Sequence, residues 1–336
     1  MLMLPMLRDS VMARIIITDG LAAAAENELR RAGHEVDSIH FAAEELAAGA
    51  IDGYEGAIIR SATKFTSEVI LAAPSLRFIG RAGVGVDNID LDAATESGII
   101  VCNTPAASTR SVVEMTIGQL LANVRFLSRA DRTMKRGQWA KKSLRGSEIA
   151  GKRLGIIGLG RIGRGVAEVA ASLSMEIHAW SRSLTTAKAI ELNINYHDTA
   201  DSLFSSCTHI TIHCAHTPET HHLVNSERLK LMPGVAPAGT VCGNHLVNIS
   251  RGGVADEQAL FEALTNGTLS TCAMDVFETE PPISDSPLLQ HPNFTASPHI
   301  GAATLEAQMR VGLEIAAAAN DFFEGNRPES QMNNPK

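Results

Sequence analysis

A glycine loop constrains the fold of this chain most, because it lies between a strand-like and a helix-like segment. GLGRIG (158–163) follows the apolar run RLGII and precedes a helix-like stretch. In such a unit Gly158 permits a tight turn, Gly160 lets a phosphate approach the backbone, and Gly163 lets helix and strand pack closely. The helix beginning near Arg161 offers free N–H groups to an anion. The loop therefore predicts a dinucleotide-binding α/β unit.

Strand-like and helix-like segments also alternate along the rest of the chain. The strand-like runs are RIIITD, GAIIR, LRFIG and IIVCN in the first part, then RLGIIG, EIHAW, HITIHC, HLVNIS, STCAMDV and NFTAS. One long helix is expected from about Thr109 to Arg136 and a final one from about Thr304 to Phe323. Alternation of this kind predicts parallel sheets covered by helices, so the fold class is α/β with two doubly wound parallel-sheet domains.

The strand after the glycine loop lacks the acidic residue that would bind the ribose 2′-hydroxyl of NAD. EIHAW is followed by Ser181 and Arg182 instead. Serine does not repel a 2′-phosphate, and arginine can pair with one. The cofactor is therefore NAD or NADP, and this pair tilts the expectation slightly toward NADP. The alternative is that Arg182 faces solvent beside a permissive NAD site.

Three further strand-like runs end in polar residues, at the edge where doubly wound sheets bind ligands. HLVNISRGG presents Arg251, AMDVFETEPP presents Asp275 and Glu280, and NFTASPHIGAAT presents His299. Arginine can grip a carboxylate, imidazole can exchange a proton near neutral pH, and a carboxylate can orient the imidazole. Together with a nicotinamide that carries hydride, this set suits oxidation of a 2-hydroxy acid. Glu278 is expected to be a solvated loop residue.

These motifs resemble the D-2-hydroxyacid dehydrogenase family, most closely its phosphoglycerate dehydrogenase branch. The matching stretches are IIRSATKFTSEVI (58–70), GRAGVGVDNIDLDAATESGIIVCNTP (80–105), LGIIGLGRIG, NISRGG, MDVFETEPP and SPHIGAAT. The resemblance extends over about residues 14–326, which makes it far more specific than a lone glycine motif.

The resemblance implies a role for each matching residue. His299 would be the catalytic acid/base, Glu280 would orient it, and Arg251 would hold the substrate. The further residues implied at the substrate are Arg60, Ser61, Ala82, Gly83, Val84 and Gly85. Those implied at the cofactor are Gly158, Gly160, Arg161, Ile162, Gly163, Ser181, Arg182, Cys214, Ile249, Ser250, Asp275 and Gly301.

The resemblance also implies a split first domain. A flavodoxin-like substrate domain would comprise residues 1–106 and 305–336, and a Rossmann NAD(P)-binding domain, 107–304, would be inserted in it. The chain stops soon after the last helix, so we expect a short form without a regulatory domain. The stretch 233–244 is longer than the family's usual connection. We expect a surface loop there, whose effect on the following strand is open.

The implied function is hydride transfer between nicotinamide and C2 of a D-2-hydroxy acid, with 3-phosphoglycerate favoured and serine biosynthesis as the setting. A glyoxylate or hydroxypyruvate reductase is the enzyme alternative, and an NAD-sensing corepressor-like binding protein is the alternative of another class. The expected partners are a small 2-hydroxy or 2-keto acid and a second copy in a homodimer. A net charge of −8 argues against nucleic acid, and no apolar run reaches membrane-spanning length.

The cysteine and histidine residues indicate the cellular compartment and whether a metal site is expected. Five scattered cysteines without a CxxC pair indicate a reduced, cytoplasmic protein. His209 and His213 share a strand face but are too far apart to ligate one ion, so no metal is expected from the group that they form with Cys214 and His216.

Overall fold

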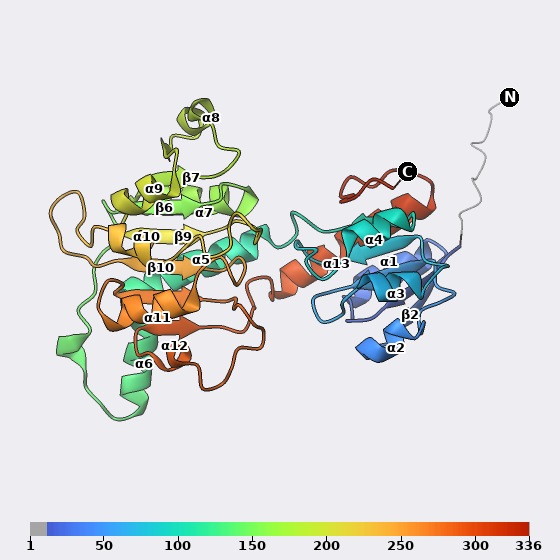
Figure 1. Ribbon diagram of the computed structural model, residues 1–336, viewed down its shortest axis with the longest axis horizontal. Helices are drawn as coiled ribbons and strands as arrows, with labels where there is room; N and C mark the ends of the chain where they lie inside the picture. Colours follow the sequence, from blue (N-terminus) through green and yellow to red (C-terminus); the bar gives the residue numbers. More distant parts are fainter. Residues whose placement is uncertain (1–11, 336) are drawn as a thin grey trace. The chain divides into compact units, whose positions relative to one another are not determined.

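The computed structural model describes residues 12–335, and the chain in it divides into two compact units. One unit runs to Ser108 and resumes at Ala303, while the other comprises Thr109–Ala302 (Figure 1). Each unit is built around its own parallel sheet. Among the described residues, no helix combines the length and apolar character needed to cross a membrane.

The first unit has a five-stranded sheet in the order β2-β1-β3-β4-β5, which is the flavodoxin-like order. Its strands are β1 (Arg14–Ile17), β2 (Glu35–Ser38), β3 (Gly56–Ile59), β4 (Phe78–Arg81) and β5 (Ile100–Cys102). Its helices are α1 (Ala23–Arg31), α2 (Ala43–Ala47), α3 (Ser67–Leu71), α4 (Leu91–Glu96) and α13 (Leu305–Phe323).

Alternate residues of these strands build two separate cores in the first unit. Ile15 and Ile17 of β1 pack in the same core as α1 and α13, whereas Ile16 lies in the core that contains residues of α2, α3 and α4. Ile58 and Phe78 join the first core, because strand side chains point alternately to opposite faces. The final helix α13 thus completes a sheet whose strands all lie near the start of the sequence.

The second unit has a seven-stranded sheet in the order β12-β11-β10-β9-β6-β7-β8, in which the strand order reverses between β9 and β6. Its strands are β6 (Arg153–Ile157), β7 (Glu176–Trp180), β8 (Asn195–Tyr196), β9 (His209–Ile212), β10 (His245–Asn248), β11 (Thr271–Met274) and β12 (Phe294–Ala296). Its α-helices are α5 (Thr109–Val124), α6 (Leu127–Lys135), α7 (Arg161–Ser172), α8 (Thr186–Glu191), α9 (Ala200–Ser206), α10 (Ser226–Leu231), α11 (Glu257–Thr265) and α12 (Pro287–Gln290), with a short 3₁₀ turn η1 (Lys141–Ser143). The order is that of a Rossmann fold, so the predicted fold class is confirmed.

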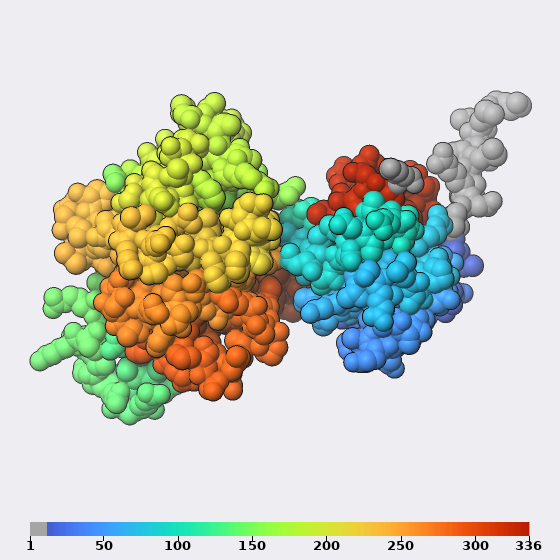
Figure 2. All heavy atoms as spheres, viewed as in Figure 1, coloured from blue at the N-terminus to red at the C-terminus, as the bar shows by residue number. Residues whose placement is uncertain are grey.

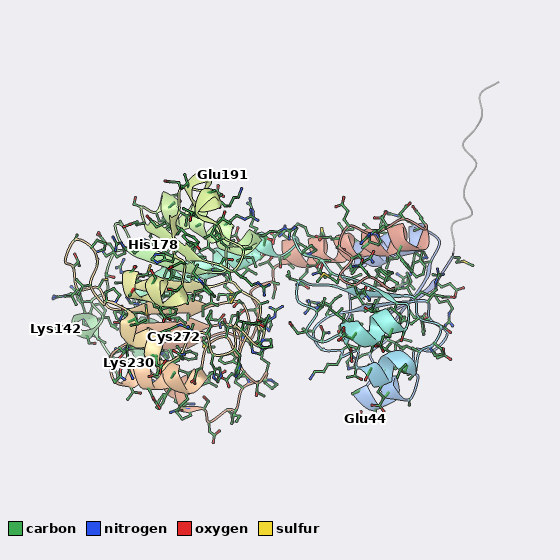
Figure 3. All side chains as sticks on the ribbon, turned by 45° about the horizontal axis from the view of Figure 1, so that its top comes forward. Glu44, Lys142, His178, Glu191, Lys230 and Cys272 are labelled. Carbon is green, nitrogen blue, oxygen red and sulfur yellow. The ribbon has the colours of Figure 1, made fainter. Side chains whose placement is uncertain are left out.

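Helices cover both faces of this sheet. Leu154 and Ile156 of β6 share a core with α5 and α7, while Ile210 and Ile212 of β9 share one with α9, α10 and α11. Cys272 lies inside the sheet on β11 and is fully buried (Figure 3). The core therefore holds the carboxyl ends of five adjacent strands in fixed register.

The long helix predicted from Thr109 to Arg136 is wrong, because the chain forms two helices there. α5 ends at Val124, and Phe126 takes a left-handed conformation with φ 53°. The Val124 carbonyl accepts a hydrogen bond from the Ser147 N–H, 3.2 Å away, and Gly146 packs directly against that carbonyl. Residues 146–147 thus occupy the Val124 carbonyl oxygen, which would accept an N–H from the next turn if α5 continued.

The extended connection 233–244 forms a compact turn outside the sheet. Val235 pairs with Val241 in an antiparallel bridge, and Val241 is 82% exposed. The Asn244 side chain closes the turn through bonds to the Gly234 N–H and to the Thr268 carbonyl. β10 pairs over all four of its residues with both β9 and β11, so this loop leaves the strand before Arg251 intact.

We expect two stacked histidines at the amino ends of β9 and β10 to make the second unit sensitive to acid. The rings of His209 and His245 lie 4.8 Å apart, and both residues are buried. Burial lowers the pKa of His245 from 6.5 to about 4, and burial followed by the charge of His245 lowers the pKa of His209. Between pH 6.5 and about 4 the unfolded chain therefore binds more protons than the folded one.

We expect stability to be complete above pH 6.5 and to fall as the pH decreases toward 4. His245 alone should cost about 2 kcal/mol between pH 7 and 5, because one unit of pKa shift corresponds to about 1.4 kcal/mol. Urea unfolding of His245→Asn at the two pH values should show a smaller difference than in the parent. His40→Asn, at an exposed position of the other unit, is the control. An undiminished difference in His245→Asn would contradict this account.

Candidate active site

The carboxyl edge of the second sheet gathers the predicted polar residues. The glycine loop follows β6, Cys214 follows β9, Arg251 follows β10, Asp275 follows β11 and His299 follows β12. Because parallel strands end on the same side, all five segments meet at one edge. The strand order reverses between β9 and β6, which is where doubly wound sheets bind their ligands.

The glycine loop has the geometry of a phosphate cradle. Gly158 has φ +89°, and a side chain there would lie 2.7 Å from the His213 carbonyl oxygen. Gly163 packs against the Gly158 carbonyl. Gly160 begins α7 without a side-chain cap, and nothing lies within 4 Å of the position that its Cβ would occupy. The first turn of α7 thus faces open space with uncapped N–H groups, as a pyrophosphate requires.

His299 and Glu280 form a hydrogen-bonded pair. His299 Nδ1 lies 2.7 Å from Glu280 Oε2, and Glu280 Oε1 accepts a bond from the Phe277 N–H at 3.0 Å. Both side chains remain partly exposed. The carboxylate therefore fixes the imidazole through Nδ1 and leaves Nε2 for a reacting hydroxyl or carbonyl.

Asp275 holds the turn that carries His299. Its carboxylate accepts bonds from the Ser297 hydroxyl at 2.6 Å and from the N–H groups of Ile300 and Gly301 at 2.9 and 2.7 Å. Its carbonyl accepts the His299 N–H at 2.8 Å. These bonds maintain the left-handed conformation of His299, φ 53°. Direct contact of Asp275 with a cofactor stays a prediction.

Arg251 is positioned by a buried asparagine. Asn248, the last residue of β10, donates to the Arg251 carbonyl at 2.9 Å and accepts the Ser250 N–H and hydroxyl at 3.0 and 2.8 Å. Arg251 Nη1 donates to the Ser250 carbonyl at 2.7 Å. Gly252 packs directly on the Phe277 carbonyl, which only a residue without a side chain allows. The Arg251 loop and the Glu280 loop are therefore in contact.

The loop after β9 contains His213 and Cys214, whose neutral forms are favoured by burial. Burial lowers the pKa of His213 to about 3, so its ring is neutral, and burial raises the pKa of Cys214 to about 11. Among residues 12–335, no group of three histidine, cysteine, aspartate or glutamate side chains is arranged to hold a metal ion.

The remaining predicted cofactor residues border the same edge. Gly301 leaves room for Ile249, since a Cβ there would lie 2.9 Å from Ile249 Cγ2. Ser181 and Arg182 follow β7, and Arg182 is exposed. Arg161 and Ile162 belong to the first turn of α7. Their contacts with a dinucleotide stay predictions.

The predicted substrate residues of the first unit meet at the carboxyl edge of its own sheet. Arg60 and Ser61 follow β3, and Ala82 to Gly85 follow β4. Asn88 joins the two segments by donating to the carbonyls of Arg60 and Thr63 at 2.7 and 2.6 Å. This edge therefore presents both segments side by side.

Several positioning residues were not predicted from the sequence. Asn248 and Ser297 are buried or half-buried polar residues near strand ends, and Glu257 follows the residue that caps α11. Polar residues inside otherwise apolar runs, such as Asn248 in HLVNIS, are the signal that could have identified them.

Comparison with known proteins decides the family. Residues 117–301 match the family model of the D-isomer specific 2-hydroxyacid dehydrogenase NAD binding domain. The chain belongs to this family. The predicted resemblance is thereby confirmed for more than half of the chain.

Named relatives extend the match to both units. A D-3-phosphoglycerate dehydrogenase of Methanocaldococcus jannaschii is 40% identical over 96% of this chain and 60% of its own length. A hydroxypyruvate reductase of Thermotoga maritima is 42% identical over 84% of this chain and 88% of its own length. The NAD⁺-bound 3-phosphoglycerate dehydrogenase of Entamoeba histolytica has a TM-score of 0.79 at 28% identity, covering 97% of this chain and 100% of that one.

The share of each relative's length that this chain covers differs between the two groups of relatives. This chain spans about 60% or less of the length of the first phosphoglycerate dehydrogenases that it matches. It spans most of the hydroxypyruvate reductase.

Proposed function

We propose that this family member is an NAD(P)-dependent D-2-hydroxyacid dehydrogenase. The observation that carries the proposal is the His299–Glu280 pair, which lies on the same sheet edge as Arg251 and the open Gly160 cradle. The enzyme interconverts a 2-hydroxy acid and its 2-keto acid. An NAD-sensing binding protein without turnover would not need a paired imidazole at this edge.

The side chains have separate tasks in this reaction. Arg251 binds the substrate carboxylate and polarises the oxygen on C2. His299 accepts the hydroxyl proton at Nε2 during oxidation and returns it to the carbonyl oxygen during reduction. Glu280 stabilises the imidazolium through Nδ1. The nicotinamide of a bound NAD(P) would supply the hydride chemistry. The glycine loop and the first turn of α7 would hold the pyrophosphate of the same cofactor.

For the substrate we favour 3-phosphoglycerate, with hydroxypyruvate or glyoxylate as the second candidate. The identity to phosphoglycerate dehydrogenases over nearly the whole chain supports the first, and the length match to a hydroxypyruvate reductase supports the second. Purified protein should be assayed with 3-phosphoglycerate, hydroxypyruvate and glyoxylate, each with both cofactors. Turnover of one of them is expected, and no turnover of any would refute the proposed activity.

Cofactor choice depends on Ser181. The parent should accept NADP, because no carboxylate lies at this position. Ser181→Asp should shift the ratio of kcat/KM values toward NAD by about ten- to hundredfold, since repulsion between two unit charges about 4 Å apart is about 1–4 kcal/mol. Initial rates with each cofactor measure the ratio, with Ser183→Asp as the neighbouring control. A parent without NADP activity would show that Arg182 merely faces solvent.

We further propose a homodimer formed through α6 and the segment after it. This segment projects from the second unit (Figure 2), and none of the α6 side chains is buried. Leu127 and Met134 are each 55% exposed on it, and Trp139 is 78% exposed. Arg129 and Arg132 bond to Asn293 and the Pro292 carbonyl. A second copy would cover the apolar side chains, as aromatic residues are enriched at interfaces.

Light scattering in dilute solution should give twice the single-chain mass of 35.8 kDa. The double substitution Leu127→Glu with Met134→Glu should produce monomers, because two charges would enter the apolar contact. Ile190→Glu, at an exposed apolar position on α8, should leave the dimer unchanged. A parent mass equal to the single-chain value would contradict the dimer.

The cytoplasm is the compartment we propose. All five cysteines are free thiols. Burial raises the pKa of Cys102 and of Cys207 to about 12, so these thiols stay protonated, as suits a reducing environment.

A further inference from the structure

Glu278 is an exposed loop residue, as its sequence context predicts, but its carboxylate is held by hydrogen bonds. Its carboxylate oxygen Oε1 lies 3.1 Å from His222 Nε2 and accepts the Glu257 N–H at 3.2 Å. Its own N–H donates to Glu257 Oε1 at 2.7 Å. Glu278 and Glu257 therefore bind each other reciprocally, backbone to side chain. We call His222, Glu257 and Glu278 the 222–257–278 clamp.

The clamp joins three segments that are far apart in the sequence. Glu257 opens α11, and Glu278 follows β11. The His222 N–H donates to the Gly253 carbonyl at 2.8 Å, two residues after Arg251. His222 thus links the two loops, because its backbone N–H bonds to the loop carrying Arg251 and its side chain bonds to Glu278 in the loop carrying Glu280. None of the clamp side chains is assigned to substrate or cofactor.

The carboxylates of the clamp are close enough to influence one another. Burial raises the pKa of Glu257, and the charges of Glu278 and Asp256 raise it further. Asp256 Oδ2 also lies 3.9 Å from His222 Nδ1. Glu257, Glu278 and the neighbouring Asp256 carry like charges, and the bonds of Glu278 with His222 and Glu257 oppose their mutual repulsion.

The geometry of Glu280 depends on the residues that the clamp holds. Glu280 Oε1 accepts the N–H of Phe277, the residue immediately before Glu278. The Phe277 carbonyl packs on Gly252. Thr279 alone separates Glu278 from Glu280, and this span is too short to absorb a displacement. A shift of Glu278 would therefore move both the carboxylate of Glu280 and the N–H that orients it.

We propose that the 222–257–278 clamp positions Glu280, and through it the imidazole of His299. The inference rests on the proposed function, in which Glu280 orients the acid/base. Glu278 is thus a positioning residue that acts through the backbone of residues 277–280. Its side chain sets the distance between Glu280 Oε2 and His299 Nδ1 rather than touching the substrate.

Kinetics of four variants test the clamp. Glu278→Ala should lower kcat by about ten- to hundredfold, because small misplacements of catalytic groups cost about that much. KM for the hydroxy acid should change little, since Arg251 is kept. Glu278→Gln should recover most of kcat, because its amide oxygen can still accept the Glu257 N–H. Glu148→Ala, at an exposed glutamate of the same unit, is the control. If Glu278→Ala does not fold, His222→Ala removes one bond of the clamp instead.

An NMR measurement tests the positioning role of the clamp independently of the proposed enzymatic activity. The Nδ1 proton of His299 should give a low-field NMR resonance in the parent, in Glu148→Ala and in Glu278→Gln, and it should shift or vanish in Glu278→Ala. This signal requires no substrate, so it decides the clamp even if no hydroxy acid is turned over. An unchanged resonance with parental kcat in Glu278→Ala would overturn the proposal. Equal losses in Glu278→Ala and Glu278→Gln would overturn it as well, because hydrogen-bond geometry would then not be the cause.

Discussion

Replacing His299 with asparagine should lower kcat by about 10²–10⁴-fold, the usual contribution of a positioned acid/base. The imidazole is held by Glu280 through Nδ1 at 2.7 Å, so only Nε2 can exchange the substrate proton. Asparagine tolerates the left-handed conformation of this position, φ 53°, and therefore preserves the turn. Steady-state kinetics with the best substrate measure the loss, and fluorescence titration should show that the cofactor still binds.

His291→Asn is the matched control for this substitution. His291 lies in the same unit, before β12 rather than after it, and its Nδ1 accepts the Asn293 N–H at 3.2 Å. Its replacement should leave kcat nearly unchanged. Near-parental turnover in His299→Asn would remove His299 from the acid/base role and leave the chemistry without its proposed proton acceptor.

Replacing Arg251 with lysine should lower kcat/KM for the hydroxy acid by about 10²–10³-fold, comparable with the loss of one preorganised donor in other enzymes. Lysine keeps the positive charge but lacks the planar fork that binds a carboxylate with two parallel bonds. The backbone of this loop is held by Asn248, so the substitution changes the head group and not the loop. Cofactor affinity should remain at the parental value.

Arg228→Lys provides the comparison for Arg251. Arg228 lies on α10, bonds to Asp201 at 2.6 Å and to the Leu223 carbonyl at 2.7 Å, and is assigned to neither substrate nor cofactor. Its replacement should not alter kcat/KM. If Arg251→Lys binds and turns over substrate as the parent does, the carboxylate grip must belong to another residue.

Much of the second unit could be predicted from local sequence. The apolar runs RLGII and HITI are buried strands, because parallel strands covered on both faces need apolar side chains throughout. GLGRIG could be placed at a strand–helix turn, because Gly158 and Gly163 meet neighbouring carbonyls that leave no room for a side chain. Polar residues directly after such runs, His299 among them, could then be assigned to one edge of the sheet.

Edge strands and helix ends were harder to predict. β2 (EVDS) is polar and β8 has two residues, and both lie at the edge of their sheets, where burial imposes little pattern. The break after Val124 depends on Gly146 and Ser147, which lie well beyond it in the sequence. No local pattern reports such a contact.

The sequence by itself determined the two α/β sheets and the residues that carry the proposed chemistry, because alternating apolar runs and glycine spacing act over a few residues. Only the tertiary structure decided how those residues are held. Asp275 accepts three bonds from residues 297–301, and Glu278 exchanges bonds with Glu257 and His222. These contacts join loops of different strands, and their geometry is set by the packing of the sheet between them. A carboxylate that looks solvated in the sequence can therefore be a fixed hydrogen-bond acceptor in the fold.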